Sequence, residues 1–201
     1  MTEDCNNFII RNGNFDRDFE GMYKKFEDPW GQRKQSGSDI YSKTAFFLLK
    51  ETLIRKKLLV DEALDIGCAD GYHAPNLIDM PNSPKYLGID ISETVINRAK
   101  KNHKCNKIKF EEANVIESND KFLNRFGLIF SSRTLYYVAP EIEAVLENIY
   151  NYLEQGGLFC FIYNQRDSSF TNKLLTYYKL DNLITSKFLI RQQLVEFDRL
   201  E

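Results

Sequence analysis

An acidic residue, a turn of small residues and a second acidic residue have the types and spacing to bind a polar small molecule. Asp65 precedes a turn in which Gly67 and Gly71 flank Ala69, and Asp90 lies nineteen residues beyond Gly71. Small residues allow the backbone to approach a ligand closely and to adopt conformations that larger side chains resist. A carboxylate at the end of a strand can accept hydrogen bonds from a polar ligand. These residues predict a ligand site at one edge of a sheet.

The chemistry of this ligand follows from the acids and from the length of the turn. Asp90 ends an apolar, strand-like run, so its carboxylate can accept hydrogen bonds from both hydroxyls of a ribose, which indicates an adenosine-containing ligand. A dinucleotide fingerprint has a turn one residue longer, and Tyr72 stands where its last glycine would fall. Asp65 would repel a pyrophosphate but suits an ammonium group. S-adenosylmethionine has an ammonium group and no phosphate, so it is favoured over a nicotinamide dinucleotide.

The elements that would position these residues alternate between strands and helices. Apolar, β-prone runs predict strands at 59–66, 85–90, 107–111, 126–131 and 158–163. Helical spacing and capping residues predict helices at 41–57, 72–79, 92–103 and 140–153. Such alternation is typical of βαβ units. We therefore expect an α/β fold, with a doubly wound, mostly parallel sheet.

The two ends of the chain have weaker patterns. Residues 1–40 are polar and irregular, and 168–183 fit a helix. Residues 184–197 fit both a strand and a helix, and we expect at least one strand there. The last strands of the sheet are expected to be degenerate, absent or supplied by another chain. One domain is predicted, with an N-terminal arm and helix that form a lid (1–57), a ligand-binding core (58–163) and a C-terminal segment (164–201).

Composition narrows the classes of partner. The chain has 201 residues and a formal net charge of −2, without the basic excess that a nucleic-acid-binding protein usually carries. No signal peptide or membrane span is evident. Four dispersed cysteines and two histidines lack the spacing of a metal site. We expect a cytoplasmic protein that binds no metal, membrane or nucleic acid, and the oligomeric state stays open.

Four segments resemble motifs of the class I S-adenosylmethionine-dependent methyltransferases, in the order of that family. They are residues 64–71, 88–92, 126–132 and 153–158, and the resemblance covers roughly residues 60 to 163. It implies a Rossmann-like class I methyltransferase fold and S-adenosyl-L-methionine as the cofactor.

The resemblance also implies cofactor-binding residues. The methionine side would be lined by Asp65, Gly67, Cys68, Ala69 and Gly71. The adenosine side would be lined by Asp90, Ile91, Ala113, Asn114 and Val115, with Ser131 from the fourth-strand motif. Asp90 would bind the ribose hydroxyls and Ile91 would lie against the adenine. Asn114 stands where the family often has an acid, and its side-chain carbonyl could accept a hydrogen bond from the adenine amino group.

The N-terminal arm has a narrower resemblance. Tyr23, Asp28-Pro29-Trp30 and Tyr41-Ser42-Lys43 resemble the leader of nodulation protein S and related small-molecule N-methyltransferases, in which this arm covers the cofactor. The resemblance implies that Trp30 belongs to an aromatic lid. Lys43 or Arg33 would pair with the carboxylate of the cofactor.

The predicted reaction is methylation of a small molecule, with an amine or amino sugar preferred. Methyl transfer from a sulfonium depends mainly on orientation, and no residue stands out as a general base; Tyr136 is the candidate. Arg133 fits either an anionic substrate or a surface ion pair. DNA amino-methyltransferases have a Pro-Pro-aromatic run after the fourth strand, which this chain lacks. Three alternatives stay open: O-methylation of a small molecule, a non-catalytic S-adenosylmethionine-binding regulator, and a nicotinamide-dependent oxidoreductase.

Overall fold

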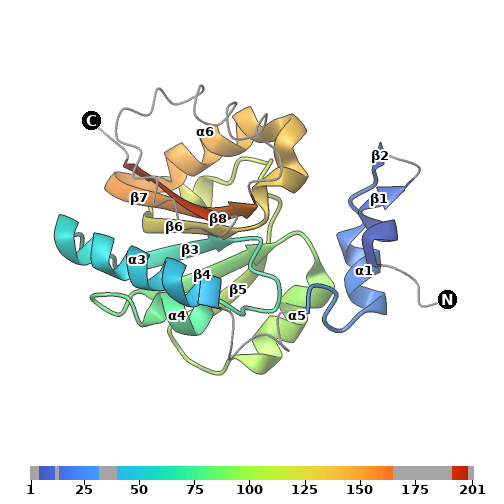
Figure 1. Cartoon of the computed structure of the whole chain (residues 1–201), viewed down its shortest axis with the longest axis horizontal. Helices are drawn as coiled ribbons and strands as arrows, with labels where there is room; N and C mark the ends of the chain where they lie inside the picture. The colour runs from blue at the N-terminus through green and yellow to red at the C-terminus, as the bar shows by residue number, and fades with distance from the viewer. Residues whose placement is uncertain (1–4, 12–13, 32–39, 165–191, 199–201) are drawn as a thin grey trace.

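The computed structural model describes residues 5–11, 14–31, 40–164 and 192–198. Six strands of these residues form one sheet in the order β5-β4-β3-β6-β7-β8 (Figure 1). The strands are β3 (Glu62–Ile66), β4 (Lys85–Asp90), β5 (Ile108–Glu112), β6 (Phe126–Ser132), β7 (Leu153–Asn164) and β8 (Gln192–Asp198). The first five are parallel to their neighbours and β8 is antiparallel to β7. The doubly wound, mostly parallel sheet is confirmed, and β8 is a strand in the region where we expected one.

The direction of winding reverses at β3. From β3 the chain moves outward to β4 and β5, and then returns to the other side of β3 to form β6 and β7. The carboxyl ends of β3 and β6 therefore border a crevice, because their crossover connections leave in opposite directions. Ligands of open α/β sheets bind at such a switch point.

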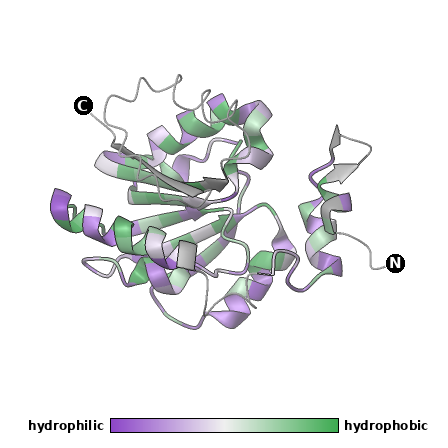
Figure 2. Ribbon diagram, viewed as in Figure 1, coloured by the Kyte–Doolittle hydropathy of each residue, from purple (hydrophilic) through white to green (hydrophobic). Residues whose placement is uncertain are grey.

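Helices cover both faces of the sheet (Figure 1). Five α-helices lie among the described residues: α1 (Phe19–Lys25), α3 (Ile40–Lys56), α4 (Ala74–Ile78), α5 (Glu93–Asn102) and α6 (Ile142–Tyr152). Three 3₁₀ helices accompany them: η1 (Cys5–Phe8), η2 (Asp120–Phe122) and η3 (Leu135–Glu141). Buried residues of α3, α4 and α5 share one apolar core with the sheet, and those of α6 share a second core on the opposite face. The hydropathy colouring shows apolar strands between these layers (Figure 2).

Helix α5 shows how local sequence fixes the edge of the site. The Ser92 side chain accepts a hydrogen bond from the amide of Val95 at 3.3 Å, which satisfies one of the donors that a helix start leaves without a partner. Val95, Ile96 and Ala99 are buried along one face. The cap and the apolar face together hold the start of α5 directly after Asp90.

Helix α3 packs on the sheet rather than over its carboxyl edge. Phe46, Leu49 and Leu53 are buried in the core. The helical spacing of the sequence also predicts core contacts for Phe47 and Ile54, but these residues are 62% and 52% exposed. The helical spacing predicted the helix correctly, but it placed these two residues on the wrong side.

The N-terminal segment is more ordered than its sequence suggests. Its short elements η1, β1 (Ile10–Arg11), β2 (Asn14–Phe15) and α1 form a small unit beside α5, away from the main sheet (Figure 1). Asp18 caps α1 by accepting a hydrogen bond from the amide of Gly21 at 2.8 Å. This acidic cap is the sequence signal from which α1 could have been predicted.

Two boundaries near α6 differ from the sequence-based expectation. Strand β7 begins at Leu153, before the glycine pair Gly156-Gly157. Its pairing with β6 shifts register near this start, where Gly156 has a φ of +77°. Pro140 lies within η3 and not in the first turn of α6.

The helix expected at 168–183 falls outside the described residues. Among the residues described, no helix combines the length and the hydrophobicity needed to cross a bilayer.

Candidate active site

A cavity of about 460 Å³ lies at the carboxyl edge of the sheet. One part of its wall comes from the residues that end β3, β4 and β6, and the opposite part comes from the N-terminal segment. Its size falls in the ordinary range of small-molecule sites, about 300–1,000 Å³. The cavity therefore occupies the switch point at which the sequence predicts a ligand.

The turn after β3 borders this cavity through Gly67 and Ala69. The amides of Gly67 and Cys68 both donate to the carbonyl of Ile89, at 2.9 and 3.0 Å, which ties the turn to β4. Gly67 has a φ of +70°, and a Cβ atom there would lie 2.3 Å from Oγ1 of Thr134. A side chain at this position would therefore collide with the protein itself.

Asp90 lies on the cavity wall with each carboxylate oxygen oriented by a backbone donor. Oδ2 accepts from the amide of Ala69 and Oδ1 from the amide of Ser92, both at 3.1 Å. Because a carboxylate oxygen can accept two hydrogen bonds, both oxygens retain capacity for a ligand hydroxyl. Burial raises the pKa of Asp90 to about 6, against the opposing effect of these backbone donors.

The part of the wall that follows β4 and β5 is apolar except for the side-chain amide of Asn114. Ile91, Ala113 and Val115 line it, and the Ile91 side chain is 49% exposed. Asn114 also lines it, but its side chain is engaged locally: Oδ1 accepts from the amide of Ile116 at 3.1 Å, and Nδ2 donates to Glu117 at 2.9 Å. Asn114 thus shapes the turn, and its Oδ1 can accept one more hydrogen bond.

Two of the residues predicted to contact the cofactor have buried side chains that do not line the cavity. Asp65 is 1% exposed and accepts a hydrogen bond from the hydroxyl of Tyr86 at 2.8 Å, and burial raises its pKa to about 7. Cys68 is 2% exposed, and burial raises the pKa of its thiol. Neither side chain lines the cavity. Asp65 instead bonds to Tyr86 of β4, and Cys68 packs in the core that α3, α4 and α5 share with the sheet.

Two further predicted contacts are also absent from the cavity wall. A Cβ atom on Gly71 would lie 2.5 Å from the ring of Phe110, so close packing accounts for this glycine. Ser131 is fully buried, and its hydroxyl donates to the carbonyl of Ile66 at 3.3 Å. The next residue, Ser132, reaches the cavity instead, because adjacent residues of a strand point to opposite sides.

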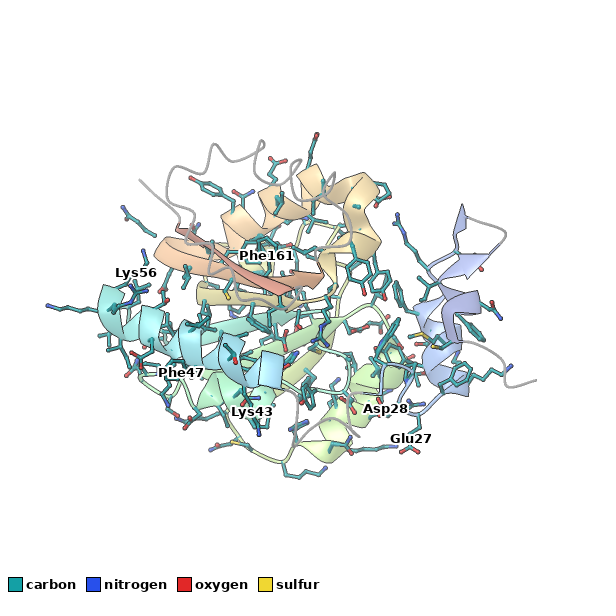
Figure 3. All side chains as sticks on the ribbon, viewed as in Figure 1. Glu27, Asp28, Lys43, Phe47, Lys56 and Phe161 are labelled. Carbon is teal, nitrogen blue, oxygen red and sulfur yellow. The ribbon has the colours of Figure 1, made fainter. Side chains whose placement is uncertain are left out.

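The cation predicted to meet the cofactor is in a different place. Lys43 is exposed on α3 and does not line the cavity (Figure 3). Arg33 lies outside the described residues. Arg17, which the sequence analysis did not single out, lines the cavity and pairs with Glu141 at 3.0 Å. No local pattern in the sequence marks Arg17, because its position depends on how the N-terminal segment packs.

Aromatic side chains from the N-terminal segment and η3 form another part of the cavity wall. The rings of Phe19 and Trp30 contact the ring of Tyr137, with centroids 5.2 and 5.8 Å apart. The hydroxyl of Tyr136 donates to that of Tyr137 at 2.9 Å, and Trp30 Nε1 donates to the Tyr23 hydroxyl at 2.9 Å. Burial raises the pKa values of Tyr136 and Tyr137. Both phenols are therefore protonated at neutral pH and serve as hydrogen-bond donors there.

Helices α1 and α5 are connected at both ends, which fixes the aromatic wall. Glu20 accepts hydrogen bonds from the hydroxyls of Ser92 and Thr94, each at 2.6 Å, and from the amide of Thr94 at 3.2 Å. Burial alone would raise the pKa of Glu20, but these hydrogen bonds lower it to about 2. At the other end, the Arg98 guanidinium donates to the carbonyls of Tyr23 and Phe26.

The comparisons with known proteins agree with this geometry. Residues 61–193 match the family described as "Methyltransferase domain". Juvenile hormone acid O-methyltransferase of Bombyx mori is 28% identical over 134 residues, which are 61% of this chain and 48% of that protein. Carboxy-S-adenosyl-L-methionine synthase of Sulfurimonas denitrificans is 32% identical over 103 residues, covering 49% of this chain and 43% of that protein. The chain thus spans about half the length of these curated relatives.

A solved structure gives the same fold over most of the chain. N-methyltransferase NodS of Bradyrhizobium japonicum, in complex with S-adenosyl-L-homocysteine, superposes with a TM-score of 0.65 at 19% sequence identity, covering 88% of this chain and 94% of that one. At this identity the likeness shows the fold alone. The family match covers more than half of this chain, and the motifs predicted from the sequence lie within it. The chain therefore belongs to the class I S-adenosylmethionine-dependent methyltransferases.

Proposed function

We propose that this chain transfers a methyl group from S-adenosylmethionine to a small molecule held in the cavity at the carboxyl edge of the sheet. The observation that carries the proposal is Asp90. Its two carboxylate oxygens are oriented by the amides of Ala69 and Ser92, and each can still accept a hydrogen bond from a ribose hydroxyl. Asp90 lies in one cavity with apolar and aromatic walls, which leaves room for a second ligand.

The fit of the residues to the cofactor follows from their chemistry. Ile91 and Val115 supply apolar surface for an adenine, and Gly67 and Ala69 present backbone without bulky side chains. S-adenosylmethionine would supply a methyl group on a sulfonium, which is a good leaving group. The task of the protein is then to exclude water and align the acceptor with the methyl group. Orientation of this kind contributes up to about 7–11 kcal/mol.

Two classes of acceptor are consistent with this proposal. The sequence-based prediction is an amine or amino sugar, and NodS, which shares the fold, is described as an N-methyltransferase. Aromatic faces such as those of Trp30 and Tyr137 attract cations, which supports a nitrogen acceptor. The second class is an oxygen acid, since the relative from Bombyx mori is described as an acid O-methyltransferase.

The other residues predicted for the cofactor site and for catalysis have different proposed roles. Asp65 and Cys68 would support the turn from beneath, whereas Asn114 would stay at the adenine. Trp30 would belong to a lid formed by the N-terminal segment. For Tyr136 we propose a donor role, because burial raises its pKa and it holds its proton at neutral pH.

The test is binding followed by turnover. The protein is titrated with S-adenosylhomocysteine by calorimetry, and then incubated with S-adenosylmethionine carrying a labelled methyl group and a panel of amines, phenols and acids. Binding together with label transfer supports the proposal. Binding without transfer to any acceptor in the panel would favour a regulatory cofactor-binding protein and contradict the proposal. Absence of binding would contradict the assignment of the site itself.

A further inference from the structure

Glu20, in the first turn of α1, binds the start of α5. Its Oε2 accepts hydrogen bonds from the hydroxyl of Ser92 at 2.6 Å and from the amide of Thr94 at 3.2 Å, and its Oε1 accepts one from the Thr94 hydroxyl at 2.6 Å. Lys24, one turn further along α1, pairs with Oε1 at 3.3 Å. The amides and the dipole at a helix start favour an anion. The carboxylate of α1 therefore holds α1 against α5, although Glu20 and Ser92 are 72 residues apart in the sequence.

Ser92 lies between two carboxylates. Its amide donates to Oδ1 of Asp90 at 3.1 Å, and its hydroxyl donates to Glu20. The Ser92 hydroxyl also accepts from the amide of Val95, and the residue is completely buried. Water therefore cannot replace either carboxylate unless the start of α5 moves. The orientation of the Asp90 carboxylate and the docking of α1 thus depend on the same residue.

The charge of Glu20 acts on Asp90 across Ser92. Burial is the main cause that raises the pKa of Asp90 to about 6; backbone hydrogen bonds oppose it, and the charge of Glu20 raises the pKa further. The two acids therefore repel each other in the protein without a ligand. Hydroxyl donors stabilise a charged carboxylate, so those of a bound ribose would offset this repulsion. A ligand at Asp90 and a docked Glu20 should then favour each other.

Docking of α1 also places the aromatic part of the cavity wall. Tyr23 of α1 is buried in an apolar cluster that the N-terminal segment forms with the turn after β3 and with α5. Trp30 Nε1 donates to the Tyr23 hydroxyl at 2.9 Å, and the ring of Trp30 contacts that of Tyr137. These three aromatic residues line the cavity, whereas Glu20 is not among the described residues that line it. An effect of Glu20 on a bound ligand would therefore pass through these rings or through Asp90.

We propose that Glu20 is a positioning residue that links the cofactor to the aromatic wall: S-adenosylmethionine at Asp90 strengthens the docking of the N-terminal segment, and the docked segment strengthens the binding of the cofactor. This inference rests on the proposed methyltransferase function and adds to it a way in which the cofactor prepares the place of the methyl acceptor. Because such a coupling is reciprocal, it can be measured from the segment and from the cofactor.

Trp30 makes the segment directly observable, because it is the only tryptophan in the chain. The fluorescence of the full chain is measured with acrylamide as the quencher, in the absence and in the presence of saturating S-adenosylhomocysteine. Docking shields the Trp30 ring against Tyr137, so we expect S-adenosylhomocysteine to lower the quenching constant about twofold or more. The affinity for S-adenosylhomocysteine is measured by calorimetry in the same buffer.

Two variants break the link from opposite sides. E20A removes the carboxylate, and T94V removes a hydroxyl that donates to it while keeping the shape of the side chain. Each should raise the quenching constant of the protein without ligand and reduce its response to S-adenosylhomocysteine. E20A should weaken S-adenosylhomocysteine binding about threefold to tenfold, and T94V by a smaller factor. Since both act on the same contact, the double variant should lose no more affinity than E20A alone.

The matched control is E93A, which removes an exposed carboxylate from the first turn of α5 itself. It should leave the Trp30 response and the affinity for S-adenosylhomocysteine within about twofold of the parent. A merely structural role of Glu20 would lower the unfolding temperature of E20A but leave both of these measurements unchanged.

Each other outcome overturns the inference in an identifiable way. A Trp30 response that persists in E20A and T94V would show that the ligand covers the ring without the help of Glu20. Unchanged affinity in both variants would remove the link between Glu20 and Asp90, while the parent's binding of S-adenosylhomocysteine would leave the methyltransferase proposal standing. If E20A does not fold, T94V against E93A decides the same two points. Failure of the parent to bind S-adenosylhomocysteine would overturn the proposed function together with this inference.

Discussion

The two ends of the cavity are built in different ways. At the end proposed for adenosine, backbone hydrogen bonds hold Asp90 and the Gly67 turn, and the residues that line the cavity lie within a residue or two of a strand end. At the end proposed for the acceptor, Trp30 of the N-terminal segment contacts Tyr137 of η3 and Arg17 pairs with Glu141, and these contacts are between side chains. One end is a consequence of sheet topology and the other of tertiary packing.

This difference indicates where specificity can change without loss of the fold. Substitutions at the adenosine end alter backbone geometry that the sheet also needs, so they should affect stability and cofactor binding together. At the acceptor end, side chains can be exchanged while α1 stays attached to α5 through Glu20 and Arg98. We therefore expect large effects on stability or cofactor affinity at the first end, and smaller effects on stability at the second.

The largest expected effect is that of Gly67→Ala. The positive φ of +70° costs about 1–2 kcal/mol for a residue with a Cβ atom, and the collision with Thr134 adds about 1–3 kcal/mol. Urea denaturation should show a loss of about 2–4 kcal/mol in the free energy of unfolding. Gly156→Ala is the control, because Gly156 has a φ of +77° and no atom lies within 4 Å of the added Cβ. This variant should therefore show only the cost of the positive φ. Equal losses for the two variants would mean that Thr134 moves away freely.

The next effect is that of Asp90→Asn on cofactor affinity. Loss of a charged acceptor for two hydroxyls should weaken S-adenosylhomocysteine binding by about 1.5–3 kcal/mol, measured by calorimetry. The control is Asp79→Asn, which weakens an exposed ion pair between Asp79, at the end of α4, and Lys50 of α3. This variant should leave the affinity unchanged. If both variants bind as tightly as the parent, the adenosine end has been assigned to the wrong part of the chain.

The pH dependence of S-adenosylhomocysteine binding also tests whether the Asp90 carboxylate binds the ribose. Burial raises the pKa of Asp90 to about 6, and the ribose hydroxyls need the deprotonated carboxylate as acceptor. Affinity for S-adenosylhomocysteine should be constant above about pH 7 and fall as pH drops through 6, by roughly tenfold at pH 5. Asp90→Asn should remove this dependence. A parent affinity that stays constant from pH 7.5 to 5 would show that Asp90 does not titrate against the ligand.

The smallest effect belongs to the attachment of α1. The carboxylate of Glu20 at the start of α5 should contribute about 0.5–1 kcal/mol, which Glu20→Gln would remove in thermal unfolding at pH 7. Since hydrogen bonds lower the pKa of Glu20 from 4.5 to about 2, this contribution is complete above about pH 4.5 and is lost as pH falls toward 2. Glu93→Gln is the control, because Glu93 is an exposed carboxylate in the first turn of α5 itself. Equal effects of the two variants would reduce the role of Glu20 to its charge alone.

The sequence predicted the adenosine end better than the acceptor end, and the reason is physical. Strand β4 and the cap at Ser92 follow from local hydrophobic runs and a single capping residue, so the position of Asp90 could be predicted from them. Whether a side chain faces the cavity or the core depends on neighbouring strands. Local patterns could therefore not show that Asp65 is buried and bonded to Tyr86, or that Ser132 and not Ser131 lines the cavity.

The acceptor end was beyond sequence patterns because its residues come together only through tertiary contacts. Arg17 pairs with Glu141, which is far away in the sequence, and no pattern near Arg17 predicts that contact. Lys43 was predicted for the cofactor from its place in a short resemblance, but α3 packs on the sheet and leaves Lys43 exposed outside the cavity.

The central claim is that this cavity binds S-adenosylmethionine, and direct calorimetric titration tests it best. The purified protein would be titrated with S-adenosylmethionine, with S-adenosylhomocysteine and, separately, with NADH. We expect one binding site of micromolar affinity for both sulfur compounds, weakened in Asp90→Asn, and no binding of NADH. Binding of NADH alone, or affinity for S-adenosylmethionine that is the same in Asp90→Asn as in the parent, would contradict it.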